Sequence, residues 1–174
     1  VLCDLCEHLP VDKVLEFNID RAVDETGIVK DSASKELKEL RRAIADSYDS
    51  LKRRLGSILR EATDQGFAQE EIITTREGRM VIPVRAEYRN RVPGFVHSAS
   101  SSGATVFVEP ADTLDLNNEV RNLQFRETRE IERILKELTA QVSEIADALI
   151  EGELRLGYLD SLQARARYSI EILG

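Results

Sequence analysis

Apolar residues recur every three or four positions along two long stretches of the chain, which predicts two long helices. The first stretch follows Ser34, a favourable N-cap residue, and contains Leu37, Leu40, Ile44, Tyr48, Leu51, Leu55, Ile58 and Ala62. The second follows Pro110 and contains Leu116, Val120, Leu123, Ile131, Leu135, Leu138, Val142, Ile145 and Leu149. Each stretch is long enough for a helix of roughly 50 Å. Two stripes of matching length predict that residues 35–65 and 114–150 pack antiparallel as a coiled-coil stalk.

Between these stretches the period of the pattern changes to two, which predicts β-strands. Along residues 79–89 one face is apolar at Met80, Ile82 and Val84, and the other carries Arg79, Arg85 and Arg89. Pro83 has no N–H group and therefore favours an edge strand. Glu77-Gly78 and Ser102-Gly103 predict hairpin turns, the second joining residues 95–100 to residues 105–109. The fold class that follows is mainly α with a small antiparallel β insertion (α+β), with strands confined to residues 71–110.

Shorter helical patterns occupy the two ends of the chain. Leu2, Leu5, Cys6 and Leu9 predict a short helix that Pro10 stops, and a second is expected over residues 11–23. A turn is expected at Thr26-Gly27. Helical spacing resumes after residue 152 through Leu154, Leu159, Leu162, Ala166, Ile170 and Leu173. Gly152 and Gly157 either break or bend the second long helix, and the pattern leaves both alternatives open.

Composition and charge narrow the possible functions. Charged residues are 32% of the 174 positions, aromatic residues are 5%, and the net charge is −8, a mixture typical of long solvated helices. The charge is uneven, because residues 76–97 hold five arginines and two glutamates. Without a long apolar run, a signal peptide or a disulfide framework, we expect a cytoplasmic protein with no membrane partner. The first residue is Val1 and the only methionine is Met80, so we expect part of a longer protein.

The candidate nucleic-acid-binding residues are the five arginines of this basic segment, Arg76, Arg79, Arg85, Arg89 and Arg91. A guanidinium group suits bidentate contact with phosphate better than an ammonium group does. Arg79, Arg85 and Arg89 would project from one face if the strand continued through residue 89. The competing interpretation is a charged face that protects an exposed sheet edge, and the residues alone favour neither.

Other patterns give little support for catalysis or metal binding. Cys3, Cys6 and His8 offer fewer than the four ligands of a structural zinc site. The serine cluster beside His97, namely Ser98, Ser100, Ser101 and Ser102, lacks a nucleophile elbow and an orienting third group. None of the nine glycines is followed by lysine, so the chain has no phosphate-binding P-loop. We therefore expect no catalytic residue, metal or cofactor in this chain.

Charged residues also alternate along the second long helix. Glu127, Glu130 and Glu137 are interleaved with Arg126, Arg129 and Arg133. This spacing predicts ion pairs between residues four apart on a solvated helix face.

Three segments carry a family resemblance: VDETGIVKDSASKELKELRRAI (residues 23–44), TREGRMVIPVRAEYRNRVPGFVHSASSSGATVFVEP (residues 75–110) and LNNEVRNL (residues 116–123). They resemble the second bacterial MutS family, MutS-two, and the similarity extends from about residue 19 to the end. The resemblance implies partial core helices (1–33), an outgoing lever helix (34–70), a β clamp (71–110), a returning lever helix (111–151) and a core helix (152–174).

The resemblance also implies a function. Such a region would be the non-catalytic lever and clamp of a MutS-like ATPase, which grips branched or structured DNA as a dimer in recombination suppression or mismatch-repair-like binding. The alternative is a coiled-coil module that docks on a protein or on the ribosome and its RNA during rescue of collided ribosomes. The complete protein would add an ATPase domain that uses ATP and Mg and an Smr-type endonuclease domain.

One pair of motifs invites a different role. MutS proper recognises mismatches with a Phe-x-Glu motif, and Phe107-Val108-Glu109 and Phe125-Arg126-Glu127 match those letters. The first lies in an expected clamp strand and the second in an expected helix. MutS-two also lacks the mismatch-reading domain, so we interpret both matches as coincidental.

Overall fold

Helix α3 (Lys35–Asp64) forms where the first apolar stripe predicts it. The helix begins directly after Ser34, and its Leu37, Leu51 and Leu55 are fully buried. All exposed positions of this helix lie off that stripe, so the sequence pattern and the packing agree. Different elements cover this apolar stripe at different points along α3, as the contacts below show.

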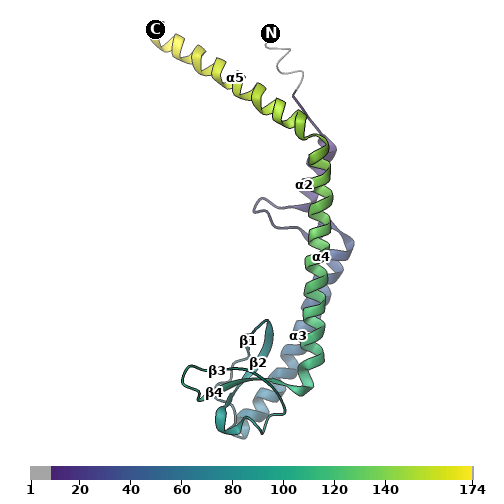
Figure 1. Ribbon diagram of the computed structural model, residues 1–174, viewed down its shortest axis with the longest axis vertical. Helices are drawn as coiled ribbons and strands as arrows, with labels where there is room; N and C mark the ends of the chain where they lie inside the picture. The colour runs from purple at the N-terminus through teal and green to yellow at the C-terminus, as the bar shows by residue number, and fades with distance from the viewer. Residues whose placement is uncertain (1–8, 174) are drawn as a thin grey trace. The chain divides into compact units, whose positions relative to one another are not determined.

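The computed structural model describes residues 9–173, which divide into two units. The sheet unit comprises residues 35–130 and contains α3, all four strands and the first part of α4 (Leu114–Glu144). The helical unit comprises the described residues before Lys35 and after Glu130. Figure 1 labels the elements of both.

The strands form one antiparallel sheet in the order β1-β2-β4-β3. They are β1 (Thr74–Arg76), β2 (Arg79–Arg85), β3 (Gly94–Ala99) and β4 (Thr105–Pro110), all inside the predicted interval. Glu77 and Gly78 both have positive φ, 52° and 75°, as a two-residue hairpin turn of type I′ requires. The second predicted hairpin, through Ser102-Gly103, joins β3 to β4. The structure therefore confirms a mainly helical chain with a small antiparallel sheet.

The prediction that Pro83 marks an edge strand is wrong. Strand β2 is central and pairs with β1 on one side and β4 on the other. Its pairing with β1 ends at Val81, and beyond that point the Gln69 N–H donates to the Pro83 carbonyl at 3.1 Å. In a strand the N–H and C=O of one residue point the same way, so the missing donor of Pro83 faces this loop. A central strand tolerates proline here because no ladder partner needs its N–H.

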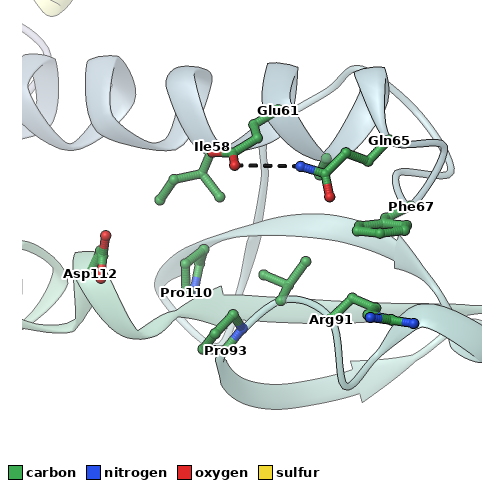
Figure 2. A pocket seen from close by; sticks show the side chains of 10 residues that line it. Ile58, Glu61, Gln65, Phe67, Arg91, Pro93, Pro110 and Asp112 are labelled. Carbon is green, nitrogen blue, oxygen red and sulfur yellow. Dashed lines mark hydrogen bonds between the residues drawn. The ribbon is translucent and has the colours of Figure 1, made fainter.

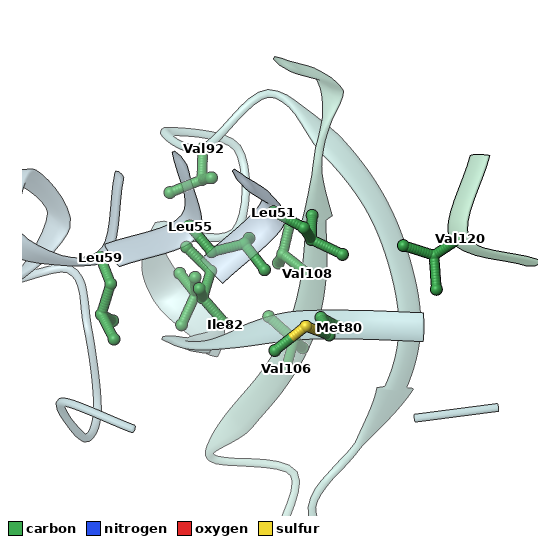
Figure 3. Packing of buried hydrophobic residues seen from close by; sticks show 10 residues of the cluster. Leu51, Leu55, Leu59, Met80, Ile82, Val92, Val106, Val108 and Val120 are labelled. Atoms are coloured by element: carbon green, nitrogen blue, oxygen red, sulfur yellow. The ribbon is translucent and has the colours of Figure 1, made fainter. Parts of the chain in front are cut away.

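The core of the sheet unit lies between α3 and one face of the sheet (Figure 3). Its buried members are Leu51, Leu55, Leu59, Met80, Ile82, Val84, Val92, Val106, Val108 and Val120. The other face of β2 is also covered, because Val81 is 0% exposed. The expected alternation between an apolar face and a solvated arginine face is therefore incomplete.

Helix α3 and the first part of α4 run antiparallel, as their side-chain pairs show. Arg41 contacts Glu127 and Tyr48 accepts a hydrogen bond from Gln124. Arg54 pairs with Asp112 of the 3-10 helix η3 (Ala111–Thr113), which directly precedes α4. Later residues of α3 thus contact earlier residues of α4, which means that the two helices run in opposite directions. Several of these α4 positions are polar, so the contact is a partly polar seam, which the apolar stripe did not predict.

The prediction that the glutamates of α4 lie on a solvated face is wrong for two of them. The Glu127 carboxylate accepts from Arg41 Nε at 2.8 Å, with both side chains about a quarter exposed. Glu130 is 5% exposed. Glu137 forms the expected surface pair, with Arg133 four residues earlier. The periodicity misled because Glu130 is buried and Glu127 is partly covered through its contact with Arg41.

The helical unit contains α2 (Lys13–Ala22), the end of α4, and α5 (Ala146–Leu173). Asp12 caps α2 by accepting from the N–H groups of Val14 and Leu15. The predicted continuous helix to residue 150 is interrupted at Ile145, whose N–H bonds to the Val142 carbonyl three residues back, a tighter turn than in an α-helix.

The two glycines of α5 neither break nor end the helix. Gly152 is buried against Pro10, and a Cβ atom there would lie 2.7 Å from the proline Cδ. The glycine therefore permits a close contact inside the helical unit. The predicted helix before Pro10, together with Cys3, Cys6 and His8, lies outside the described residues.

Candidate nucleic-acid interface

A buried carboxylate organises the second face of the sheet. Glu109 of β4 is 1% exposed. Its Oε1 accepts from Arg79 Nη1 at 2.5 Å, and its Oε2 lies 2.7 Å from His97 Nε2. Arg79 Nη2 also donates to Asn118 Oδ1 of α4 at 2.5 Å. A buried charge needs such partners, so these contacts tie β2, β3 and α4 to β4.

A β-bulge places His97 in this network. The pairing of β3 with β4 shifts between Val96 and Ser98, which leaves His97 as the extra residue. A bulge re-aims side chains, and here the imidazole lies against Glu109. Its other ring nitrogen, Nδ1, lies 3.8 Å from the Glu77 carboxylate. Both nitrogens face carboxylates, so neither is directed at a serine hydroxyl.

The serines near His97 serve the hairpin turn. Ser100 Oγ accepts from the Thr105 N–H at 3.2 Å and lies 3.3 Å from Ser102 Oγ. The Ser98 hydroxyl is buried with no hydrogen-bond partner. Ordinary turn chemistry accounts for the Ser100 and Ser102 contacts.

Asn117 holds the sheet to α4 and has no counterpart among the sequence-predicted residues. It is 2% exposed. Its Oδ1 accepts from the Met80 N–H at 3.0 Å, and its Nδ2 donates to the Met80 carbonyl at 3.1 Å. The Asn117 side chain thus makes the two hydrogen bonds to the Met80 backbone that a neighbouring strand would otherwise make. A polar residue among the apolar positions of α4 was the signal that could have identified it.

Two of the five predicted arginines are engaged within the sheet. Arg79 is held by Glu109 and Asn118, and its side chain is only 18% exposed. Arg76 lies over the Phe107 ring, 4.0 Å from its centroid, and bonds to the Thr75 carbonyl at 3.0 Å. Both guanidinium groups therefore stabilise the sheet. Replacing Arg79 should therefore lower the stability of the sheet.

The other three arginines are exposed at one end of β2 and in the loop that follows. Arg85 ends the strand, Arg89 follows the 3-10 helix η2 (Ala86–Tyr88), and Arg91 lies in the turn before β3. Because the strand ends at Arg85, the expected alternation through residue 89 does not hold. None of the three has an ion pair within residues 9–173. Their charge is available to a partner.

A small hollow lies beside Arg91. It measures about 200 Å³ and lies between α3 and the segment around Pro93 (Figure 2). Apolar side chains such as Ile58, Phe67 and Pro110 line it, and Glu61, Gln65, Arg91 and Asp112 stand at its polar positions. Ligand pockets usually measure about 300–1,000 Å³. The hollow is too small for such a role.

The two Phe-x-Glu matches occupy unrelated places. In the first, Phe107 lies under Arg76 and Glu109 is buried. In the second, Phe125 is 61% exposed on α4 with Arg129 near its ring, and Glu127 pairs with Arg41. These placements support the interpretation of both as coincidental.

Within residues 9–173, no group of three or more His, Cys, Asp or Glu side chains is placed to hold a metal ion. None of the helices in that interval combines the length and apolar character that crossing a membrane requires.

The fold and the interface define a pair of antiparallel helices that carries a small sheet with exposed arginines. Endonuclease MutS2 of Clostridioides difficile (strain 630) is 41% identical over 174 residues, which is 100% of this chain and 22% of that relative. The protein of the same name from Pelotomaculum thermopropionicum is 46% identical over 155 residues, 89% of this chain and 20% of the relative. That of Symbiobacterium thermophilum is 40% identical over 172 residues, 99% and 22% respectively.

The chain belongs to the MutS2 family, the second bacterial MutS family. It spans about a fifth of the length of the curated relatives it matches. No protein-family model matches the chain.

Proposed function

We propose that this chain is the lever and clamp region of a MutS2 protein and that its sheet grips the phosphate backbone of branched or structured nucleic acid. In this proposal α3 is the outgoing lever, the sheet is the clamp and α4 is the returning lever. Helices α2 and α5 belong to the core. The proposed boundaries are residues 1–33, 34–70, 71–110, 111–151 and 152–174.

The observation that carries the proposal is the division of labour among the arginines. Arg79 and Glu109 make the sheet a rigid support, while Arg85, Arg89 and Arg91 keep exposed, unpaired charges. Contacts of this kind fix a protein on a nucleic acid without recognising its bases. A rigid support lowers the entropy that is lost on binding.

The remaining functions are proposed for the complete protein. The relatives are named endonucleases, which supports a nuclease elsewhere in the complete protein, outside this chain, and we propose an Smr-type domain for it. ATP and Mg would bind in a separate ATPase domain, because this chain contains no Gly-Lys pair. Pairing of two protomers would then bring two clamps around one nucleic acid. The lever and clamp region itself would be non-catalytic.

A second candidate function is docking on a protein or on a ribosome. The outer strand β3 favours it, because Phe95 is 62% exposed and Val96 is 47% exposed beside a free strand edge. Exposed apolar groups on an edge strand are suited to contact with another macromolecule. This surface contains no arginine, so the two candidates predict different effects of charge removal.

The test is a salt titration of binding. In the 174-residue chain, Arg85→Gln, Arg89→Gln and Arg91→Gln are combined, and anisotropy of a labelled four-way DNA junction is measured. Each lost phosphate contact should lower the slope of log K against log salt by about 0.7–0.9. We therefore expect a slope smaller by about 2–3 and weaker binding.

The matched control combines Lys35→Gln, Lys38→Gln and Arg42→Gln, which removes the same charge from the exposed start of α3. It should bind nearly as the parent chain does. If the arginine variant folds normally and retains its affinity and slope, the arginines are not the grip, and docking through β3 becomes the better proposal.

A further inference from the structure

A second set of cations lies on α3, away from the sheet arginines. Lys52, Arg53 and Arg60 line a groove of about 680 Å³ between this helix and the segment that leads into β1. All three are exposed, and within residues 9–173 none has an ion pair. Arg53 bonds only to the Ser50 hydroxyl, and Arg60 only to the Gly56 carbonyl, each at 3.2 Å. The groove holds one carboxylate, that of Glu71 on its opposite wall.

The spacing of these cations matches a chain of phosphates. Residues 53 and 60 are seven positions apart, which is roughly 10 Å along a helix. One strand of duplex DNA places a phosphate about every 3.4 Å along the duplex axis, so with α3 parallel to that axis this separation spans about three phosphates. Three exposed cations against one carboxylate also give the groove a net positive potential.

Gly56 gives a further indication. The residue lies inside α3, where glycine is less favourable than alanine. Its φ is not positive, and a Cβ atom would meet nothing within 4 Å. Neither the backbone nor the packing of this chain requires glycine at this position. An absent side chain keeps the middle of the groove open between the cations.

We propose that this groove binds a nucleic-acid phosphate backbone as a second contact, separate from the sheet arginines. The inference rests on the proposed nucleic-acid function, which it extends to another face of the sheet unit. The ammonium and guanidinium groups of Lys52, Arg53 and Arg60 contact successive phosphates. The contact is independent of base sequence.

The first test removes the charge of the groove. Lys52→Gln, Arg53→Gln and Arg60→Gln are combined in the 174-residue chain, and binding to a labelled duplex of about 30 base pairs is titrated with salt. We expect the slope to fall by about 2–3, with at least tenfold weaker binding. The Lys35, Lys38 and Arg42 triple variant is again the control, because it has the same charge and lies on the same helix.

Two single variants separate the groove from general charge. Gly56→Leu fills the groove without changing its charge and should weaken binding while leaving the fold intact. Glu71→Gln removes the opposing carboxylate and should tighten binding by about two- to fivefold, the size of one exposed charge interaction. A loss of folding cannot imitate this increase in affinity.

The outcomes are distinct. If the groove variant binds DNA normally and the Arg85, Arg89 and Arg91 variant binds it more weakly, the inference about the groove is overturned and the proposed function is retained. Absence of binding by the parent chain overturns both. Binding to poly-glutamate is also measured for the parent chain and for the groove variant. If the groove variant loses poly-glutamate binding as much as DNA binding, the groove binds an acidic protein and the inference is overturned.

Discussion

The two units of this chain differ in how they cover their apolar side chains. In the sheet unit, α3 presents one stripe, and Leu37, Leu51 and Leu55 on it are fully buried. In the helical unit, α5 is of similar length, yet Leu154, Tyr168 and Ile170 are 71%, 66% and 73% exposed. A helix that is apolar on several sides is typical of one surrounded by protein. Helix α5 therefore gains little stability from packing within the described residues, whereas α3 gains much.

The largest effect should come from the core of the sheet unit. Leu55→Ala removes a fully buried side chain and should lower the free energy of unfolding by about 2–5 kcal/mol. Leu154→Ala, the same change in α5, should shift it by less than about 0.5 kcal/mol. Urea denaturation followed by circular dichroism measures both. Equal losses would show that α5 is packed as tightly as α3.

The buried network should come next. Arg79→Gln leaves the Glu109 carboxylate without its guanidinium partner and should cost about 2–3 kcal/mol, in the range of hydrogen bonds to charged groups. Arg85→Gln, at the other end of the same strand, is exposed and should cost less than about 0.5 kcal/mol. The measurement is again urea denaturation. Similar values for the two variants would mean that Arg79 does not support the sheet.

Asn117→Ala should have a somewhat smaller effect. The change leaves the buried N–H and C=O of Met80 without partners, which should cost about 2 kcal/mol. Asn122→Ala on the exposed side of α4 is the control and should be nearly neutral. Amide exchange at Met80 gives a direct readout, because its N–H should exchange faster only in the Asn117 variant. Unchanged protection at Met80 would contradict the assigned role.

The smallest effect should come from the loop of the helical unit. The hydrogen bond from the Thr26 hydroxyl, followed by that from the Ile28 N–H, lowers the pKa of Asp24 below its ordinary value of 3.8. A lowered pKa stabilises the fold above the ordinary value, and this contribution disappears as the pH falls through the folded-state pKa. Thr26→Val should raise the pKa of Asp24 toward 3.8, as NMR titration of its carboxyl carbon would show. No change would mean that the hydroxyl does not contribute.

The same comparison explains what the sequence could predict. The stripe of α3 and the turn at Glu77-Gly78 depend on neighbours in the chain, and both were predicted correctly. The burial of Glu109, the capture of Arg79 and the role of Asn117 arise from partners 30 to 39 residues away. Nothing local distinguishes such a carboxylate or amide from a solvated one. The central position of β2 likewise depends on its pairing with β4.

The prediction of the candidate interface had the same limit. The five arginines were identified by type, but their surroundings decide which charges remain exposed. Arg85, Arg89 and Arg91 remain candidates, whereas Arg76 and Arg79 are held by Phe107 and Glu109. The groove cations of α3 were not among the predicted residues, because the sequence alone does not show that they line one groove. Their alignment on one side of the helix matters more than their number.

The pairing of α3 with α4 has a consequence for the order of folding. Arg41 and Glu127 are 86 residues apart, whereas the hairpin of β1 and β2 closes over two residues. Bringing distant segments together costs more chain entropy, so local hairpins should form before the helices meet. Once the sheet has formed, the remaining loop between the helices is already closed. Val81→Ala should then slow folding, while Glu127→Gln should mainly speed unfolding. Stopped-flow kinetics measures both rates. If Glu127→Gln slows folding and Val81→Ala mainly speeds unfolding, the helices pair before the hairpin forms.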